Sequence, residues 1–488
     1  MLSGYLFRAY PTLTQTTHLR RWIGHQRFIK NSKVRERDAL YADFKEGKLS
    51  EIPAPNQKYA QFHSEETAWL SDVPSQILRN GAYRFAIAHT RFRKGLGGAP
   101  SVQKKHGRQS VLVTSELFTF TTEVDPETGK VAHALTLGSK TQPLGRLHFK
   151  AHRDFTPPKM LSISVAPSGK WFVSFCSEAP SLEGAPDVLR TPEELAYEFG
   201  LRDDLNNVTV GVDRGVAVSA ATSSGATFHA CDVNQKRINK RERRAQRYQR
   251  KMARQVKGSV NRRKTKQRIA RLKEYGANAR LDFAHKTSAT LVKSAEVLVF
   301  EDLKVQNMTA TPAPRPGGAG RYARNGAAAK AGLNKALLQS SWGRTLEFAR
   351  YKAARMNKLV LTVPAAYSSQ ECSRCGHVHK DNRVSQSLFT CVACGHTENA
   401  DVNAAKVIKK RGVTLLKEKK MPSKKKKTAR VTKDPSRKIK VGVGFPEPDV
   451  SPKPVESVLD VRGSLAACGA VLYEAGNPRL PAQAGSGG

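Results

Sequence analysis

Long hydrophobic runs, acidic residues and cysteines are all scarce in this sequence of 488 residues. No stretch approaches roughly 18 consecutive apolar residues, so the sequence predicts no transmembrane helix. Residues 1–15 lack the basic region and apolar core of a secretory signal. The seven cysteines are an odd number, and four of them form two close pairs, which is typical of metal binding in a reducing compartment rather than of a disulfide framework. The sequence therefore indicates a cytoplasmic protein without a membrane partner.

The shortage of acid leaves a large excess of positive charge. The sequence contains 83 Lys and Arg against 41 Asp and Glu, a formal net charge of +42. Such an excess repels itself in a compact protein unless an anionic partner offsets it. The basic residues extend along the whole chain, which favours a long polyanion over a membrane surface. With 39% hydrophobic residues the chain can still form packed cores, so we expect a folded protein that binds nucleic acid.

The patterning changes several times along the chain. A short strand at 5–10 precedes a segment, 14–94, whose apolar spacing is mostly helical. Between 110 and 178, alternating residues and turns predict strands at 112–122, 145–149, 161–165 and 171–176. A linker rich in Pro, Gly and acids covers 180–194. A new unit opens with strands at 208–212, 216–221 and 227–230. Long basic helices are predicted at 236–274. They are followed by an apolar strand at 297–300, an amphipathic helix at 342–357 and a second apolar strand at 359–363.

Two Cys-x-x-Cys pairs lie fifteen residues apart. Each pair directs two thiolates at one metal ion, and a glycine follows each of them, as the turn requires. Four thiolates form a closed tetrahedral site that suits structural Zn²⁺, and His377, His379 and His396 are interpreted as surface residues. The predicted zinc ligands are Cys372, Cys375, Cys391 and Cys394.

Three acidic residues stand at the edges of apolar segments. Asp213 follows Thr209–Val212, Glu301 follows the strand at 297–300, and Asp401 lies where a helix begins. Carboxylates at such edges are typical of a binding site, although Asp401 alone could also serve as a helix N-cap. If they converge, three carboxylates can hold two Mg²⁺ ions, which activate a water and stabilise the leaving oxygen of a phosphodiester.

The order of these motifs resembles that of the TnpB proteins, transposon-associated RNA-guided DNA nucleases related to the compact type V CRISPR effectors. The motifs are Gly-Val-Asp213-Arg-Gly, Phe-Glu301-Asp-Leu, the four-cysteine ribbon and Asn-Ala-Asp401-Val-Asn-Ala-Ala. They cover about 206–413, and the likeness extends more weakly to 7–15, 72–75 and 168–175. The resemblance implies an α+β multidomain protein whose RNase H-like (RuvC-like) domain uses Asp213, Glu301 and Asp401 as its metal-binding triad.

The resemblance also implies a domain division and partners. Residues 1–13 and 105–195 would form a wedge-like β-barrel with a helical recognition lobe, 14–104, inserted in it. The RuvC-like domain would comprise 206–366 and 397–413, interrupted by a zinc ribbon at 367–396, and 414–488 would be a basic, largely disordered tail. The partners would be a guide RNA and a double-stranded DNA target, bound in a bacterial or archaeal cell and cut beside a short adjacent motif.

Nucleic-acid contacts are predicted on three elements. The segment 236–274 has eighteen Lys and Arg against two Glu, a density that needs a polyanion. A helix near 73–92 carries side chains that can read base edges, and the ribbon carries one arginine that could stabilise phosphate charge. Residues 310–332, rich in Gly, Ala, Pro and Arg, are predicted to be a mobile lid, and Lys424–Lys427 could bind RNA or be a solvated tail. The predicted contacts are Ser75, Gln76, Arg79, Asn80, Arg243, Arg244, Arg247 and Arg374.

Three alternatives share this sequence pattern. A compact type V CRISPR effector would use the same chemistry with a repeat-derived guide. An RNA-guided repressor without cleavage would be expected to lose triad acids, yet all three are present. A transposase that joins DNA could use the same fold, but the inserted ribbon and the motif order favour the guided nuclease.

Overall fold

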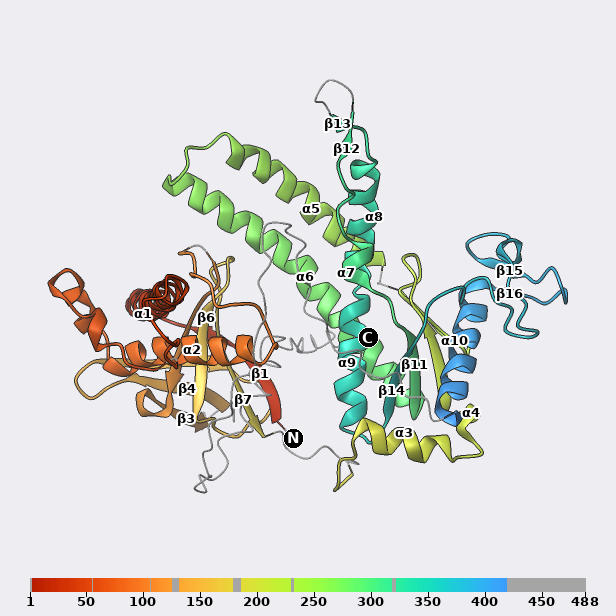
Figure 1. The fold of residues 1–488 in the computed structure, drawn as a ribbon, viewed down its shortest axis with the longest axis horizontal. Helices are drawn as coiled ribbons and strands as arrows, with labels where there is room; N and C mark the ends of the chain where they lie inside the picture. The colour runs from red at the N-terminus through yellow and green to blue at the C-terminus, as the bar shows by residue number, and fades with distance from the viewer. Residues whose placement is uncertain are drawn as a thin grey trace, which may run out of the picture. The chain divides into compact units, whose positions relative to one another are not determined.

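The computed structural model describes residues 2–54, 56–105, 107–124, 131–178, 186–229, 232–317 and 322–418. These residues form two compact units, one up to residue 178 and one from residue 186 (Figure 1). The predicted tail is described only to residue 418, so Lys424–Lys427 lie outside the described residues. None of the helices in this part of the chain is long and apolar enough to cross a membrane.

The first unit is built on a seven-stranded antiparallel sheet with the order β2-β6-β7-β1-β5-β4-β3. The edge strands β2 and β3 are joined by only three residues, which form the 3-10 turn η3. This short connection requires the sheet to curve until its two edges approach each other. The strands are β1 (Leu2–Tyr10), β2 (Gln109–Thr114), β3 (Phe118–Val124), β4 (Val131–Gly138), β5 (Pro143–Lys150), β6 (Met160–Val165) and β7 (Trp171–Glu178).

The helices of the first unit share one hydrophobic core with this sheet. They are α1 (Leu13–Lys45) and α2 (Ser75–Arg93), joined through the 3-10 turns η1 (Ala60–Phe62) and η2 (Glu65–Asp72). Gln26 of α1 links them to the sheet, because its side chain accepts from the Leu112 amide at 2.8 Å and donates to the Leu112 carbonyl at 3.0 Å. The predicted helical segment is therefore packed on the strands.

The second unit contains a five-stranded mixed sheet with the order β10-β9-β8-β11-β14. Strands β8, β11 and β14 are parallel, whereas β9 and β10 form an antiparallel meander that continues from β8. In chain order this is 3-2-1-4-5. The strands are β8 (Thr209–Asp213), β9 (Ala220–Thr222), β10 (Thr227–Phe228), β11 (Val297–Glu301) and β14 (Leu359–Val363).

Helices cover both faces of this sheet, because alternate strand residues point to opposite sides. Val297 and Val299 pack with α3 (Pro192–Gly200) and α10 (Ala400–Lys417), whereas Leu298 and Phe300 pack with α6 (Val260–Ser294) and α9 (Trp342–Ala354). The short α4 (Leu205–Val208) leads into β8. Helix α10 lies so close to β8 that a Cβ at Gly211 would come within 2.0 Å of the Ala405 carbonyl oxygen. The second unit is thus a three-layer α/β sandwich.

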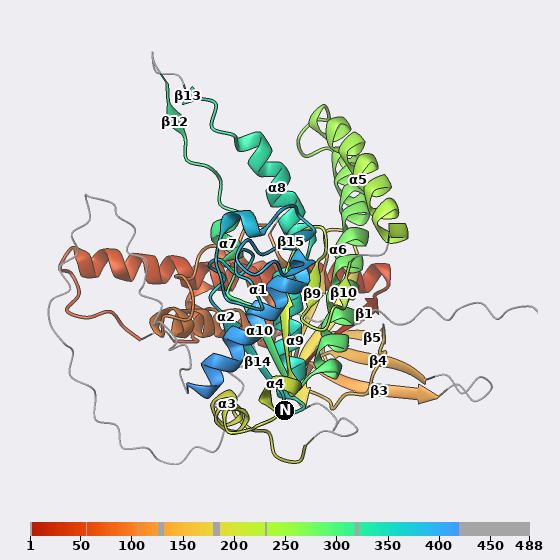
Figure 2. The same cartoon turned by 90° about the vertical axis from the view of Figure 1, so that its right-hand side faces the viewer.

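The basic segment forms an antiparallel helical hairpin of α5 (Asp232–Ala253) and α6 that extends beyond the sheet (Figures 1 and 2). In the predicted lid region, β12 (Arg315–Pro316) pairs with β13 (Tyr322–Ala323), and α8 (Ala327–Gln339) begins there. A short helix, α7 (Val305–Met308), precedes this region. The ribbon contains η5 (Lys380–Asn382), β15 (Leu388–Thr390) and β16 (Thr397–Asn399).

Candidate active site and metal centre

The register of the parallel strands brings two predicted acids together. Val212 of β8 is paired with Phe300 of β11, so the next residues, Asp213 and Glu301, lie side by side at the carboxyl edge. Neighbouring strands are about 4.8 Å apart, which is close enough for two carboxylates to share a ligand or to repel each other. Carboxyl edges of parallel strands are also where α/β proteins bind ligands.

The third acid enters this edge on α10. Asn399 is the N-cap of α10, and its side chain accepts from the amides of Asp401 at 3.0 Å and Val402 at 3.2 Å. The alternative that Asp401 is itself the cap is therefore wrong. The Asp401 carboxylate instead lies 3.5 Å from the guanidinium of Arg383, a ribbon residue that the sequence interpretation missed.

The charges of Glu301 and Asp401 both act on Asp213, although the three carboxylates do not all lie within 4.8 Å of one another. Burial raises the pKa of Asp213 to about 7, and the negative charges of Glu301 and Asp401 add to this effect. Burial likewise raises the pKa of Glu301, whose Oε1 accepts a 2.5 Å hydrogen bond from the Ser368 hydroxyl, and the pKa of Asp401. Acids held at such an edge at this electrostatic cost are a candidate functional site. Since carboxylate oxygens are the ligands of Mg²⁺, this donor set fits that ion.

Buried donors fix the loop after β8. The Arg214 side chain is only 5% exposed; it donates to the main-chain oxygen of Glu301 and lies over the Phe300 ring. The indole nitrogen of Trp342 donates to the Gly215 oxygen at 2.8 Å. Arg214 therefore holds the two strand ends together.

The four predicted zinc ligands form one cluster. Their sulfur atoms all lie within 4.8 Å of one another, and among the described residues no other group of three or more His, Cys, Asp or Glu meets this limit. The Cys372–Cys394 and Cys375–Cys391 sulfurs are 3.7 and 3.6 Å apart. A tetrahedral ion with Zn–S bonds of about 2.3 Å requires sulfurs about 3.8 Å apart, so the cluster fits zinc.

The two cysteine turns are built alike and are joined by asparagines. In each turn the amide of the following glycine donates 2.9 Å back to the first cysteine's carbonyl. Fully buried Asn382 donates to the His377 carbonyl and accepts from the Val392 amide, which links the turns. Asn403 of α10 accepts from the Ser373 amide at 2.9 Å. Asn403 thereby attaches the helix that carries Asp401 to the ribbon.

The residues predicted to read bases have different environments. Ser75 is exposed at the start of α2 and Gln76 is half-buried. Arg79 forms a 2.5 Å ion pair with Glu116. Asn80 is 2% exposed, and its amide donates to the Leu112 carbonyl at 3.2 Å. The prediction is wrong for Asn80, because its side chain serves the helix–sheet contact and cannot reach a base edge.

The basic residues of α5 are presented to solvent. Arg243, Arg244 and Arg247 are exposed. The acid Glu242 is occupied within the fold, because Lys335 and Gln339 of α8 bind it at 2.8 and 3.3 Å. Arg374 is exposed on the ribbon, whereas Arg383 is the ribbon arginine in contact with an acid of the site.

The fold and the site define a mixed α+β protein with a carboxylate cluster at a sheet edge and a four-cysteine ribbon beside the helix that supplies the third acid. Family models match three parts of the chain: "Helix-turn-helix domain" at 1–46, "Probable transposase" at 190–311, and "Cas12f1-like, TNB domain" at 342–408. Residues 2–45 form β1 and the single helix α1 rather than two helices.

The chain is similar to whole proteins as well. It is 31% identical over 421 residues, 85% of this chain and 93% of the relative, to "Putative RNA-guided DNA endonuclease InsQ" of Escherichia coli (strain K12). It is 26% identical over 83% of its length, and 88% of the relative, to "Putative RNA-guided DNA endonuclease" of Streptomyces pristinaespiralis. A Cas12f1–sgRNA–target DNA complex aligns with 84% of this chain and 98% of its own at a TM-score of 0.45 and 10% identity. The chain belongs to the TnpB family, as its motif order predicts.

Proposed function

We propose that this protein is an RNA-guided DNA endonuclease that binds a guide RNA and cleaves complementary DNA beside a short adjacent motif. The observation that carries the proposal is the strand register that places Asp213 and Glu301 at neighbouring strand ends, where the charge of Asp401 also acts on Asp213. The family relationship supports the same activity, since both relatives are named RNA-guided DNA endonucleases. Because its substrate is DNA, the protein would act in the cytoplasm of a bacterial or archaeal cell, at the nucleoid when it is bound to DNA.

The architecture supports an RNase H-like (RuvC-like) domain. Its evidence is the sheet order 3-2-1-4-5 with one antiparallel strand and with acids at the ends of the first and fourth strands. We assign 206–366 and 397–413 to this domain and 367–396 to a ribbon that holds structural Zn²⁺. The curved sheet of the first unit supports a wedge-like β-barrel formed by 1–13 and 105–195, with 14–104 as the recognition lobe.

The chemistry assigned to the triad is phosphodiester hydrolysis. Asp213, Glu301 and Asp401 would hold two Mg²⁺ ions, which supply an activated water and stabilise the leaving oxygen. The protein's own residues set the site for this work. Ser368 orients Glu301, Arg214 fixes the backbone of the two strand ends, and Arg383 offsets the charge of Asp401.

The exposed arginines of α5 are assigned to the phosphate backbone of the bound nucleic acid. Backbone contacts of this kind are independent of sequence and weaken as salt rises. Sequence would instead be read by pairing with the guide. RNA that copurifies with the protein distinguishes the origin of that guide: transposon-end RNA indicates a TnpB context, and repeat-derived RNA indicates a CRISPR context.

Neighbouring carboxylates provide a matched test. Glu301→Gln removes a triad charge, whereas Asp302→Asn removes the exposed charge next to it. We expect Glu301→Gln and Asp213→Ala to lower single-turnover cleavage by at least about a thousandfold, with guide and target binding unchanged and Asp302→Asn active. Full cleavage by Asp213→Ala would reject the proposal. If the unsubstituted protein bound neither a guide RNA nor a DNA target, a different partner would be favoured.

A further inference from the structure

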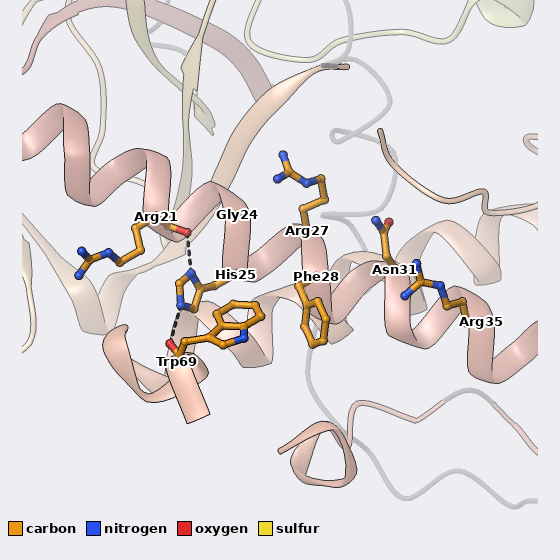
Figure 3. Close-up of a pocket in the computed structure, with 8 residues that line it drawn as sticks. All are labelled: Arg21, Gly24, His25, Arg27, Phe28, Asn31, Arg35 and Trp69. Atoms are coloured by element: carbon orange, nitrogen blue, oxygen red, sulfur yellow. Dashed lines mark hydrogen bonds between the residues drawn. The ribbon is translucent and has the colours of Figure 1, made fainter. Parts of the chain in front are cut away.

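A pocket in the first unit lies on α1 beside η2 (Figure 3). Its volume is about 400 Å³, within the roughly 300–1,000 Å³ of small-ligand pockets. Figure 3 shows the rings of His25, Trp69 and Phe28 next to one another, with Arg21 and Arg35 on either side. No acidic residue lines the pocket. The lining residues are Arg21, Gly24, His25, Arg27, Phe28, Asn31, Arg35 and Trp69.

The aromatic wall of this pocket is held in place by hydrogen bonds. The ring nitrogens of His25 lie 2.8 Å from the carbonyl oxygens of Arg21 and Trp69, so the ring ties η2 to α1. The Trp69 ring contacts His25 and Phe28 edge-on, with centroids 4.6 and 5.0 Å away. Trp69 nevertheless remains 39% exposed. A large ring fixed at the surface is a pre-organised stacking surface, because binding then costs little conformational entropy.

The arginines of the pocket keep charge available for a ligand. Within the described residues, neither Arg27 nor Arg35 forms an ion pair with a carboxylate, and Arg27 donates only to the neutral side chain of Gln109, at 3.2 Å. Arg21 approaches Asp72 at 3.9 Å, and both side chains are about half exposed. Guanidinium groups beside aromatic rings recognise phosphates and nucleobases together.

Gly24 supplies an independent observation. Glycine inside a helix costs stability relative to alanine, so it needs a reason. Gly81 of α2 has one, because its Cβ would come within 2.8 Å of the Gln26 carbonyl oxygen. A Cβ at Gly24, in contrast, would meet nothing within 4 Å, and its φ is not positive. The fold does not require this glycine, but its missing side chain leaves the pocket floor open.

We propose that this pocket binds one unpaired nucleotide, with its base against Trp69 and Phe28 and its phosphates among Arg21, Arg27 and Arg35. The inference rests on the proposed function, since it assumes that the protein works on nucleic acid. It assigns to the recognition lobe a site that holds a nucleotide outside the paired guide–target duplex. Guide RNA and DNA both supply this chemistry, and the test distinguishes them.

The test is photocrosslinking of the full-length protein to single strands of about ten nucleotides. One RNA strand carries 5-iodouridine and one DNA strand carries 5-iododeoxyuridine, and crosslinked peptides are identified by mass spectrometry. We expect crosslinks to Trp69 or Phe28 in addition to crosslinks elsewhere. Crosslinking by the RNA strand alone assigns the nucleotide to the guide, by the DNA strand alone to the target, and by both to chemistry shared by the two.

Two pairs of variants complete the test. Gly24→Leu places a large side chain at a pocket-lining position whose Cβ would meet nothing within 4 Å, and it should lower crosslinking at Trp69 by at least about fivefold, whereas Gly24→Ala should preserve it. Arg35→Ala should also lower it, whereas Arg20→Ala, an exposed α1 residue outside the pocket, should not. The proposed nucleotide site would be overturned if crosslinks formed elsewhere but not at Trp69 or Phe28. It would also be overturned if Gly24→Leu and Gly24→Ala gave equal crosslinking yields at Trp69. No crosslink anywhere would overturn the proposed function instead.

Discussion

The cysteine cluster and the carboxylate cluster lie in the same unit, and both offer ligands suited to a metal ion, yet they are organised differently. The cysteine sulfurs are already at ligand spacing, and asparagines and backbone amides satisfy the turns around them. Burial and the nearby charges of Glu301 and Asp401 raise the pKa of Asp213 to about 7. The first arrangement is typical of a structural site that favours folding, and the second of a functional site that folding must tolerate.

The largest expected effect is at the four-cysteine site. Cys391→Ser removes one of four thiolates and should abolish stoichiometric zinc binding, because each ligand contributes several kcal/mol of a total of roughly 10–16 kcal/mol. Cleavage should be lost as well, since Asn403 joins the ribbon to the helix carrying Asp401. Zinc content and limited proteolysis of 367–399 measure the change.

Val392→Ala is the control for the cysteine variant, because Val392 lies in the same turn with a side chain 57% exposed. It should retain zinc and activity. A Cys391→Ser protein that keeps a full complement of zinc and a protease-resistant ribbon would contradict the structural role of the cluster.

The next effect concerns the arginine that the ribbon contributes to the acids. Arg383→Ala removes a cation that lowers the pKa values of Asp401 and Asp213, so both values should rise. The acidic limb of the pH–cleavage profile should shift to higher pH, and the rate at neutral pH should fall by about a hundredfold. Lys380→Ala is the matched control, because Lys380 is an exposed cation of the same ribbon with no assigned role. Equal profiles for the two variants would show that Arg383 has no role at the acids.

A third experiment measures the cost of the carboxylate cluster. The folded-state pKa of Asp213 is about 7, above its usual value near 3.9. The folded protein therefore binds a proton that the unfolded chain has released, and stability falls as pH rises from about 4 to about 7. Without added divalent cations, Asp213→Asn should become progressively more stable than the unsubstituted protein across this window, by up to about 4 kcal/mol.

Thermal unfolding followed at several pH values measures this difference. Asp203→Asn, at an exposed site in the same unit, is the control. If the difference in stability between Asp213→Asn and the unsubstituted protein were the same at all pH values, the pKa of Asp213 would not be raised in the folded protein.

The smallest expected effect is at Ser368. Ser368→Ala removes the hydrogen bond to Glu301 that lowers the pKa of that acid, so the pKa of Glu301 should rise further. One hydrogen bond to a charged group is worth about 1.5–3 kcal/mol, so the Mg²⁺ concentration for half-maximal cleavage should rise about tenfold. Ser369→Ala is the adjacent control, and an equal Mg²⁺ requirement in both variants would remove Ser368 from the site.

Much of this organisation was predictable from the sequence because it depends on local patterns. Apolar runs predicted β8, β11 and β14, and the cysteine spacing predicted the cluster that the structure shows. Strand β4 was missed, since Val131–Gly138 mixes small and polar residues with weak alternation. The strand predicted at 112–122 is divided by η3, because the chain turns a sheet corner there.

The supporting polar residues could not be predicted in the same way. Arg383 and Ser368 are single loop residues and Asn382 ends the short η5, and only the folded chain brings them to the acids or the cysteine turns. Asn80 was assigned to the wrong environment because helical spacing gives the face of α2 but not what covers it. The sheet against α2 determines that its amide is buried.

The position of α10 has a consequence for how the protein is made. On the ribosome, β8, β11 and β14 emerge before the ribbon, and α10 emerges after it. Until α10 is synthesised and docks, the sheet lacks part of the cover over Val297 and Val299, and the third acid is not in place. A nascent chain interrupted before residue 400 therefore carries only two of the three acids, so translation itself would delay the onset of cutting.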